Sequence, residues 1–158
     1  MDIIIRPAVK EDYAGVKKLM VQSLQHHSEM RPDTYRLSEE FFVIEEYVET
    51  LEKAHILLAA DKNNIVGLVS YSIGEIKAAS VHPFRRVMVD ELVVDINCRR
   101  AGVATMLMDA VHQAAKENKA DRIQLFVNAL NTGAIELYKK QGFTPEMIRM
   151  EYILDKEG

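Results

Sequence analysis

The chain has 158 residues, 48% hydrophobic and 28% charged, a composition typical of one globular domain rather than of a disordered chain. Its formal net charge of −4 gives no basic footprint for nucleic acid. No apolar run reaches the roughly 18 residues that span a bilayer, the first residues lack the pattern of a secretory signal, and one cysteine cannot form an internal disulfide. We therefore expect a single cytoplasmic domain over residues 1–158 that binds neither nucleic acid nor membrane.

The spacing of apolar residues and the positions of chain-breaking residues predict the secondary structure. The expected elements in chain order are a strand at 2–6, helices at 12–27 and 38–51, strands at 55–60, 65–73 and 86–94, a helix at 102–118, a strand at 122–127, a helix at 131–141 and a last strand or hairpin at 143–154. This order, β-α-α-β-β-β-α-β-α-β, predicts an α/β fold with helices on the faces of a mixed sheet.

The second predicted helix begins at Ser38, a residue type that caps helices, and has glutamates in its first turn. Its apolar residues recur at helical spacing, which predicts one buried stripe. The stripe is expected to consist of Phe41, Ile44, Val48 and Leu51.

The stretch NCRRAGVATMLM at 97–108 lies between a predicted strand and a predicted helix. The first amides of a helix have no partner within it, and together with the helix dipole they attract an anion. Gly102 lets a phosphate approach without a Cβ in the way, and Arg99 and Arg100 could reach phosphate oxygens. A solvated pair of loop arginines is the alternative. We favour a phosphate site.

Two motifs narrow the kind of phosphate ligand. The chain has neither GxxxxGK[ST] nor GxGxxG, but R-x-x-G-x-A at 99–104 follows an acidic, apolar strand. Farther along, 131–143 reads N-x-x-A-x-x-L-Y-x-K-x-G-F. Together and in this order, the two motifs resemble the pyrophosphate loop and the distal Asn/Tyr/Gly-Phe motif of the GNAT superfamily of acyl-CoA-dependent N-acyltransferases. The resemblance implies a mixed, mostly antiparallel sheet with helices on both faces.

The resemblance also implies that acetyl-CoA (coenzyme A) is the cofactor. One strand would expose backbone groups to the pantetheine arm, the loop amides would hold the pyrophosphate, and an asparagine would add a contact. The residues that match these positions are Leu92, Val93, Val94, Arg99, Arg100, Ala101, Gly102, Val103, Ala104, Thr105 and Asn131.

Transfer of an acetyl group to an amine requires a base, because a free alkylammonium has a pKa near 10. Asp90 or Glu91, on the implied cofactor strand, could take this proton directly or through water. Strict alternation groups Glu91 with Val89 and Val93, but a bulge would change that count, so both carboxylates stay open. Backbone donors of the strand would stabilise the oxyanion.

Tyr138 could protonate the departing thiolate, whose acid has a pKa of about 8.5 against about 10 for the phenol. A packing role for its ring is the alternative. Cys98 could form an acyl-enzyme, but no base is paired with it in the sequence, so we interpret it as an unreactive loop thiol. No histidines have metal-ligand spacing, and we expect no metal.

The acceptor is the least constrained part of the function. Six glutamates lie between Glu39 and Glu52 with no lysine or arginine among them, a field that attracts a cationic amine but is also typical of a solvated helix face. Polyamines, amino-sugar antibiotics, amino acids and protein amines all remain candidates, and a homodimer is a possible assembly. The sequence thus favours an N-acetyltransferase that transfers acetyl directly to a primary amine, with a non-catalytic acyl-CoA-binding module of the same fold as the alternative.

Overall fold

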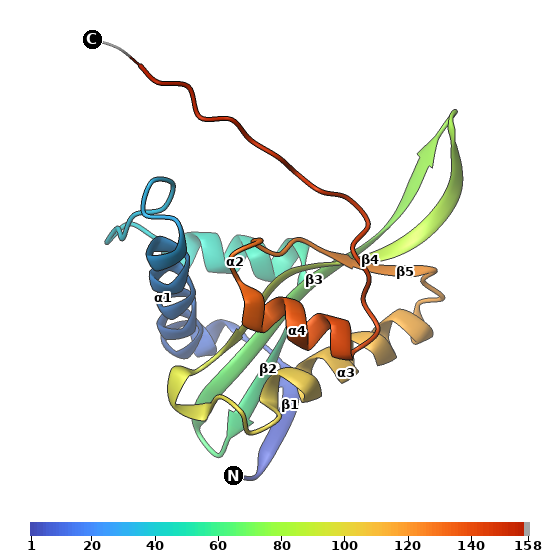
Figure 1. Cartoon of the computed structure of the whole chain (residues 1–158). Coiled ribbons are helices and arrows are strands. Elements are labelled where there is room, and N and C mark those ends of the chain that lie inside the picture. The colour runs from blue at the N-terminus through green and yellow to red at the C-terminus, as the bar shows by residue number, and fades with distance from the viewer. Residues whose placement is uncertain (157–158) are drawn as a thin grey trace. The chain divides into compact units, whose positions relative to one another are not determined.

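The structure is a computed structural model that describes residues 1–156 (Figure 1). The chain forms two compact units. The first unit, Met1–Phe126, contains β1 (Ile3–Pro7), α1 (Tyr13–Met30), α2 (Ile44–Lys53), β2 (His55–Asp61), β3 (Asn64–Ala78), β4 (Val81–Val94), α3 (Val103–Glu117), β5 (Arg122–Leu125) and the short 3-10 turns η1 (Lys10–Asp12) and η2 (Ile96–Cys98). The second unit begins at Val127 and contains α4 (Thr132–Lys140).

The first unit is built around one five-stranded sheet in the order β1-β2-β3-β4-β5. Neighbouring strands from β1 to β4 are antiparallel, while β4 and β5 are parallel. A parallel pair needs a crossover connection, which α3 supplies between the two strands. The predicted mixed, mostly antiparallel sheet is therefore confirmed.

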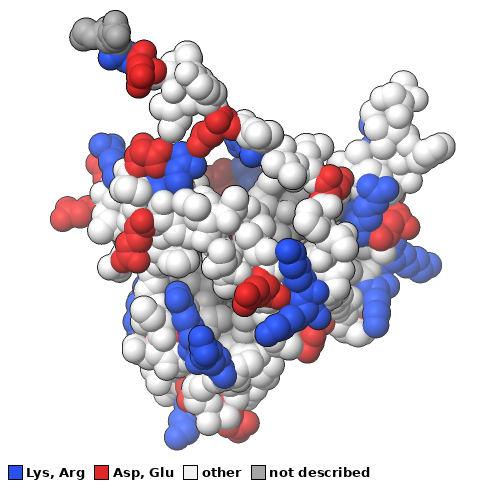
Figure 2. All heavy atoms as spheres, in the orientation of Figure 1, with Lys and Arg blue, Asp and Glu red and all other residues white. Residues whose placement is uncertain are grey.

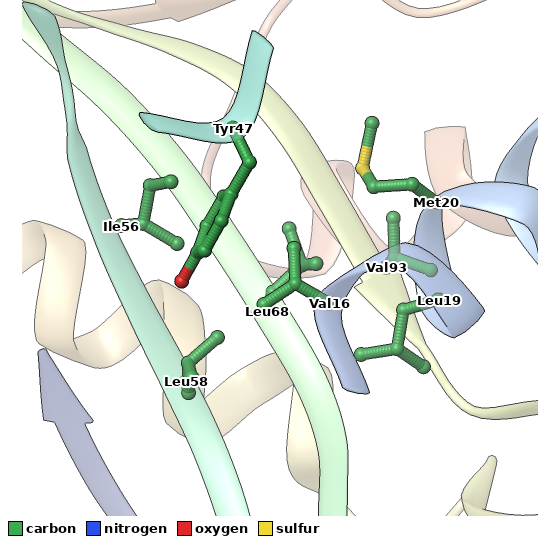
Figure 3. Packing of buried hydrophobic residues seen from close by; sticks show 8 residues of the cluster. All are labelled: Val16, Leu19, Met20, Tyr47, Ile56, Leu58, Leu68 and Val93. Carbon is green, nitrogen blue, oxygen red and sulfur yellow. The ribbon is translucent and has the colours of Figure 1, made fainter. Parts of the chain in front are cut away.

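Two neighbouring residues of β3 show which helices cover which face. Leu68 is buried in a cluster with side chains from α1 and α2, among them Val16 and Tyr47 (Figure 3). Successive side chains of a strand point to opposite faces, so Gly67 faces the other way, toward α3. A Cβ on Gly67 would lie 2.9 Å from Val103 Cγ1 and 3.0 Å from Leu107 Cδ1. Helices on both faces of the sheet are confirmed, and Gly67 permits the close approach of α3.

The predicted start of the second helix is wrong. Residues 38–42 form turns, in which the Glu40 amide donates to Ser38 Oγ at 3.2 Å, and Phe42 has a left-handed φ of 53° that a continuous helix does not allow. The expected buried stripe also changes, because Ile44 is 40% exposed and Tyr47 is fully buried. Burial of Tyr47 is possible because its hydroxyl donates to the Val9 carbonyl at 2.6 Å.

The last predicted strand is also wrong. Residues 143–156 form no helix or strand, whereas the preceding helix has the expected position. An alternating sequence specifies the two faces of a strand but does not supply the neighbouring strand that its backbone needs. Within the described part of the chain, no helix is long and apolar enough to cross a membrane.

Candidate active site

The loop that follows β4 is fixed at its start by a buried carboxylate. Asp95 is 4% exposed and accepts hydrogen bonds from the Asn97 amide at 2.9 Å and from Lys18 Nζ at 3.1 Å. The Asn97 amide and Lys18 hold the pKa of Asp95 below its usual value. The end of β4 is thus tied to α1, and the chain then turns through η2 toward α3.

Left-handed backbone shapes the next part of the loop. Arg100 has a φ of 62° and Gly102 a φ of 79°, while no atom lies within 4 Å of a Cβ built on Gly102. Gly102 is favoured here by its backbone conformation and leaves open space where a side chain would stand. It caps α3 without a side chain, and the first helical hydrogen bond runs from the Met106 amide to the Gly102 carbonyl at 3.0 Å. The amides of residues 103–105 therefore precede the helical ladder and are suited to an anion.

The predicted phosphate-binding residues lie around these amides. Arg99 and Arg100 are exposed, as are Ala101, Gly102 and Thr105, whereas the Val103 side chain is buried and Ala104 is half-buried. Both arginines and the neighbouring Ala101 and Gly102 are thus open to solvent, while Val103 anchors the helix start. This donor set fits a pyrophosphate.

An opening in the sheet lies beside the loop. The parallel ladder between β4 and β5 runs from Arg86 with Arg122 to Val89 with Leu125 and ends there. The remaining residues of β4 continue to pair with β3 as far as Val94 with Gly67. The backbone of Leu92, Val93 and Val94 is therefore outside the β5 ladder on one side. An extended ligand with amide groups could pair with such an edge.

A β-bulge interrupts β4 at the predicted carboxylates. Ser70 pairs with Glu91 and Tyr71 with Val89, which leaves Asp90 as the extra residue of β4. Glu91 therefore shares a face with Val93, in the cluster beneath α1 and α2, but not with Val89. Strict alternation, which grouped all three, is wrong at this point.

Burial distinguishes Glu91 from Asp90. Glu91 is half-buried, and desolvation raises its pKa; the charge of His27 lowers it and that of Asp90 raises it. Asp90 is exposed, although desolvation also raises its pKa. Of the two predicted carboxylates, Glu91 is the more enclosed, and such perturbed groups gather at functional sites.

His27 is a neighbour of this carboxylate that sequence reasoning missed. Its Nδ1 lies 2.8 Å from the Ser23 carbonyl, and its ring packs against Tyr35 at 5.4 Å between centroids. His27 follows the buried Met20 by seven residues, about two helical turns, so the helical period already placed both on one face of α1.

The remaining predicted site residues, Asn131 and Tyr138, belong to the short helix α4 of the second unit. Asn131 Oδ1 accepts from the Ala134 amide at 3.2 Å and so caps α4. At the other end, Gly142 has a φ of 92°, its amide donates to Lys139, and the Phe143 amide donates to Tyr138. The half-buried Tyr138 ring packs against Phe143 at 5.7 Å. These contacts form a Schellman motif with its hydrophobic contact, so the distal sequence motif also encodes both ends of α4.

A polar pocket lies beside Cys98. A pocket of about 580 Å³ is lined by Cys98 together with Asp12, Lys18, Asp61 and Asp95, among others, and by none of the predicted cofactor-binding residues. No histidine lines it, so the pocket gives Cys98 no imidazole base. No group of three potential metal ligands occurs in the described residues.

Comparison with known proteins decides the family. A family model described as the acetyltransferase (GNAT) family matches residues 20–143. The chain belongs to this family. The match includes β4, the loop before α3, and α4 through Phe143, so both sequence motifs of this GNAT acetyltransferase lie within it. A comparison with curated proteins found no match.

Solved structures share the fold of this acetyltransferase. A tetramutant of the BH1408 protein from Bacillus halodurans is 24% identical, with a TM-score of 0.91 over 96% of this chain and 99% of that one. A Trypanosoma brucei acetyltransferase is 16% identical, with a TM-score of 0.70 over 97% and 100% of the two chains. An aminoglycoside acetyltransferase from an uncultured soil metagenomic sample, in complex with sisomicin, is 16% identical, with a TM-score of 0.69 over 97% of each chain. At these identities the likeness shows the fold.

Proposed function

We propose that this GNAT protein is an enzyme that moves an acetyl group from acetyl-CoA to a primary amine by direct transfer. The observation that carries the proposal is the end of the β4–β5 ladder at Val89 and Leu125, beside the uncapped N-terminus of α3. The part of β4 beyond Val89 has an open strand edge, and the start of α3 has free amides and two arginines. Their combination suits a ligand that has both an amide-bearing arm and a pyrophosphate.

Coenzyme A has these two parts, and when bound it supplies the activated acetyl thioester. The backbone of Leu92, Val93 and Val94 would pair with the pantetheine arm. The amides and side chains from Arg99 to Thr105 would bind the pyrophosphate. The cap on α4 uses only the side-chain oxygen of Asn131, which leaves the NH₂ group of that side chain to donate to the cofactor.

One side chain would act as the base for the ammonium group and another as the acid for the thiolate. Glu91 would take a proton from the ammonium group of the acceptor, directly or through water, with Asp90 as the second candidate. The amine nitrogen then forms a bond to the acetyl carbon as the carbon–sulfur bond breaks. Tyr138 would donate its hydroxyl proton to the thiolate, and backbone N–H groups of β4 would stabilise negative charge on the acetyl oxygen.

The acceptor is proposed only as a primary amine, small or on a protein. One structural neighbour acts on aminoglycosides according to its name, but at 16% identity this supports the fold rather than the substrate. In this chain, Glu45, Glu46, Glu49 and Glu52 are all exposed, and Glu49 pairs with Lys53. Basic side chains are interspersed with acidic ones on the face drawn in Figure 2. The α2 glutamates therefore fit a solvated helix face as well as an acceptor surface.

The proposal is tested by incubating the purified protein with acetyl-CoA and a panel of polyamines, aminoglycosides, amino acids and peptides, and by measuring free thiol. We expect amine-dependent thiol release that a Glu91→Gln variant does not support. Tight binding of acetyl-CoA without release for any amine would favour the non-catalytic acyl-CoA-binding module.

If transfer is direct, Cys98 does not carry the acetyl group at any stage. The Cys98→Ser variant should keep its activity, and intact-mass measurement with acetyl-CoA alone should find no stoichiometrically acetylated protein. Acetylation at Cys98, together with loss of turnover in the variant, would replace direct transfer with an acyl-enzyme route.

A further inference from the structure

His27 is a titratable side chain beside Glu91 that the proposed acetyl transfer does not yet use. The two residues come from different elements of the first unit, since His27 lies on α1 and Glu91 on β4. Both side chains are half-buried. The charge of His27 acts on the carboxylate of Glu91, so the imidazole lies within electrostatic reach of the proposed base.

The direction of α1 explains why these two residues meet. Lys18, in the first half of α1, contacts Asp95 just after β4, with 3.1 Å between Nζ and Oδ2. His27, in the second half of α1, acts on Glu91, which precedes Asp95 in the chain. The helix therefore crosses this face of the sheet antiparallel to β4.

Buried packing holds the helix and the strand together between these two contacts. Met20 of α1 and Val93 of β4 belong to one buried cluster (Figure 3). From Met20, His27 lies seven residues farther along the helix, which is about 10 Å. From Val93, Glu91 lies two residues back along the strand on the same face, which is about 7 Å. The imidazole and the carboxylate are thus presented by two packed elements rather than by a loop.

The surroundings of His27 fix which ring nitrogen exchanges a proton. Nδ1 lies 2.8 Å from the Ser23 carbonyl oxygen, which only accepts hydrogen bonds, so Nδ1 carries a proton. Nε2 is then the nitrogen that gains and loses a proton. Tyr35 packs against the imidazole at 5.4 Å between ring centroids and restricts its orientation. The ring is therefore oriented as a base or relay requires.

A base that accepts a proton in each turnover must also release it. An ordinary imidazole has a pKa of about 6.5 and an ordinary glutamate one of about 4.3, so a carboxylic acid readily passes its proton to a neutral imidazole. We propose that His27, acting through Glu91, is a proton relay whose Nε2 receives the proton that Glu91 takes from the acceptor ammonium. This inference rests on the proposed acetyl transfer.

The relay balances without another reactant. An N–H bond of the ammonium breaks as an O–H bond forms on Glu91, and that O–H bond breaks as an N–H bond forms at Nε2 of His27. Solvent water then takes the proton, and the pair returns to an ionised carboxylate and a neutral imidazole. Other titratable groups nearby are Asp90, whose charge raises the Glu91 pKa, and His26 and Tyr35, whose rings lie beside that of His27.

Chemical rescue tests the relay. His27→Ala leaves space for a small imidazole, and kcat should fall by about 100-fold with little change in KM for the amine. Added imidazole should restore much of the lost turnover, whereas it would restore nothing if the ring of His27 served only for packing. The matched control is His26→Ala, which removes the neighbouring imidazole of the same helix and should keep the wild-type kcat. If His27→Ala fails to fold by circular dichroism, His27→Asn should show the same loss of kcat.

A second measurement is independent of turnover. His27→Asn keeps an N–H donor for the Ser23 carbonyl but does not titrate. Carbon-13 NMR of the Glu91 carboxyl group should give a higher pKa in this variant than in the wild type, because the imidazolium charge that lowers the Glu91 pKa is lost. An unchanged Glu91 pKa would overturn the pair. Transfer that proceeds at the wild-type rate in the His27 variants would overturn the relay alone, and absence of thiol release from the wild type with every amine would overturn the proposed function as well.

Discussion

At the level of single residues, the adjacent carboxylates Asp90 and Glu91 differ in their surroundings. Glu91 pairs with Ser70 in register with the pair of Val93 and Leu68, so it lies on the face that carries α1, where desolvation raises the Glu91 pKa. A carboxylate with a raised pKa accepts a proton more readily than an ordinary carboxylate does.

The first prediction concerns Glu91. Glu91→Gln removes the base but keeps the side-chain volume, so we expect kcat/KM to fall by about 10²–10⁴. The acidic limb of the wild-type pH profile should lie above the ordinary glutamate pKa of about 4.3 and should disappear in the variant. The matched control, Asp90→Asn, should keep most of the activity. The reverse ranking of the two variants would assign the base to Asp90.

The second prediction concerns Tyr138. Tyr138→Phe keeps the ring that packs against Phe143 and removes only the hydroxyl. Turnover should fall by about 10²–10⁴ with little change in CoA affinity, and the loss should shrink with an acyl donor whose thiol is more acidic. Steady-state kinetics with acetyl-CoA measure the effect. A wild-type rate in the Phe variant would leave Tyr138 with a packing role alone.

At the scale of elements, the close contact of α3 with the sheet holds the phosphate-binding loop in place. Gly67 provides that contact, because its missing side chain leaves room for Val103 at the first turn of α3. Asp95 fixes the other end of the loop through Lys18 of α1. Loop position therefore depends on packing on both faces of the sheet.

The third prediction concerns this helix–sheet contact. Gly67→Ala places a methyl group against Val103, Leu107 and the Val93 carbonyl, so we expect a loss of about 1–3 kcal/mol in the free energy of unfolding and weaker CoA binding. Urea denaturation and calorimetric titration measure the two effects. Gly74→Ala is the matched control, since nothing lies within 4 Å of its added Cβ. Equal behaviour of the two variants would contradict the packing role of Gly67.

At the scale of the whole molecule, stability should depend on pH through buried carboxylates. The Asn97 amide and Lys18 lower the pKa of Asp95 in the folded state. Its ionised form therefore stabilises the folded protein above the ordinary aspartate pKa of about 3.9, and this contribution is lost as the pH falls through the folded-state pKa.

The fourth prediction follows from the lowered pKa of Asp95 in the folded state. Asp95→Asn should lower the free energy of unfolding by about 1–2 kcal/mol near neutral pH, and the difference from wild type should shrink as the pH falls below the ordinary aspartate pKa of about 3.9. Urea denaturation at several pH values measures it. Glu49→Gln, which breaks an exposed pair with Lys53, is the control and should change stability little at any pH. A difference for Asp95→Asn that stays constant with pH would contradict the assignment.

Elements whose ends depend on neighbouring residues could be predicted from the sequence. The helix at 131–141 was predictable because Asn131 and Gly142 carry the capping chemistry of its two ends. The start of α2 was not, because the left-handed Phe42 interrupts a favourable helical pattern. The bulge at Asp90 depends on pairing with β3, and the alternating pattern of 147–154 predicted a strand that the structure does not form. Strand pairing depends on contacts between segments that are distant in the sequence, and these contacts cannot be deduced from a single sequence.

The most direct test of the central claim is calorimetric titration of coenzyme A into the wild-type protein and the Arg99→Glu, Arg100→Glu variant. The claim is that the loop between β4 and α3 holds the pyrophosphate of the acyl donor. We expect saturable binding by the wild type and a loss of affinity of at least about 100-fold in the variant, because two attractive charges become repulsive. Circular dichroism should show both proteins folded. Equal affinity of the two folded proteins would contradict the account.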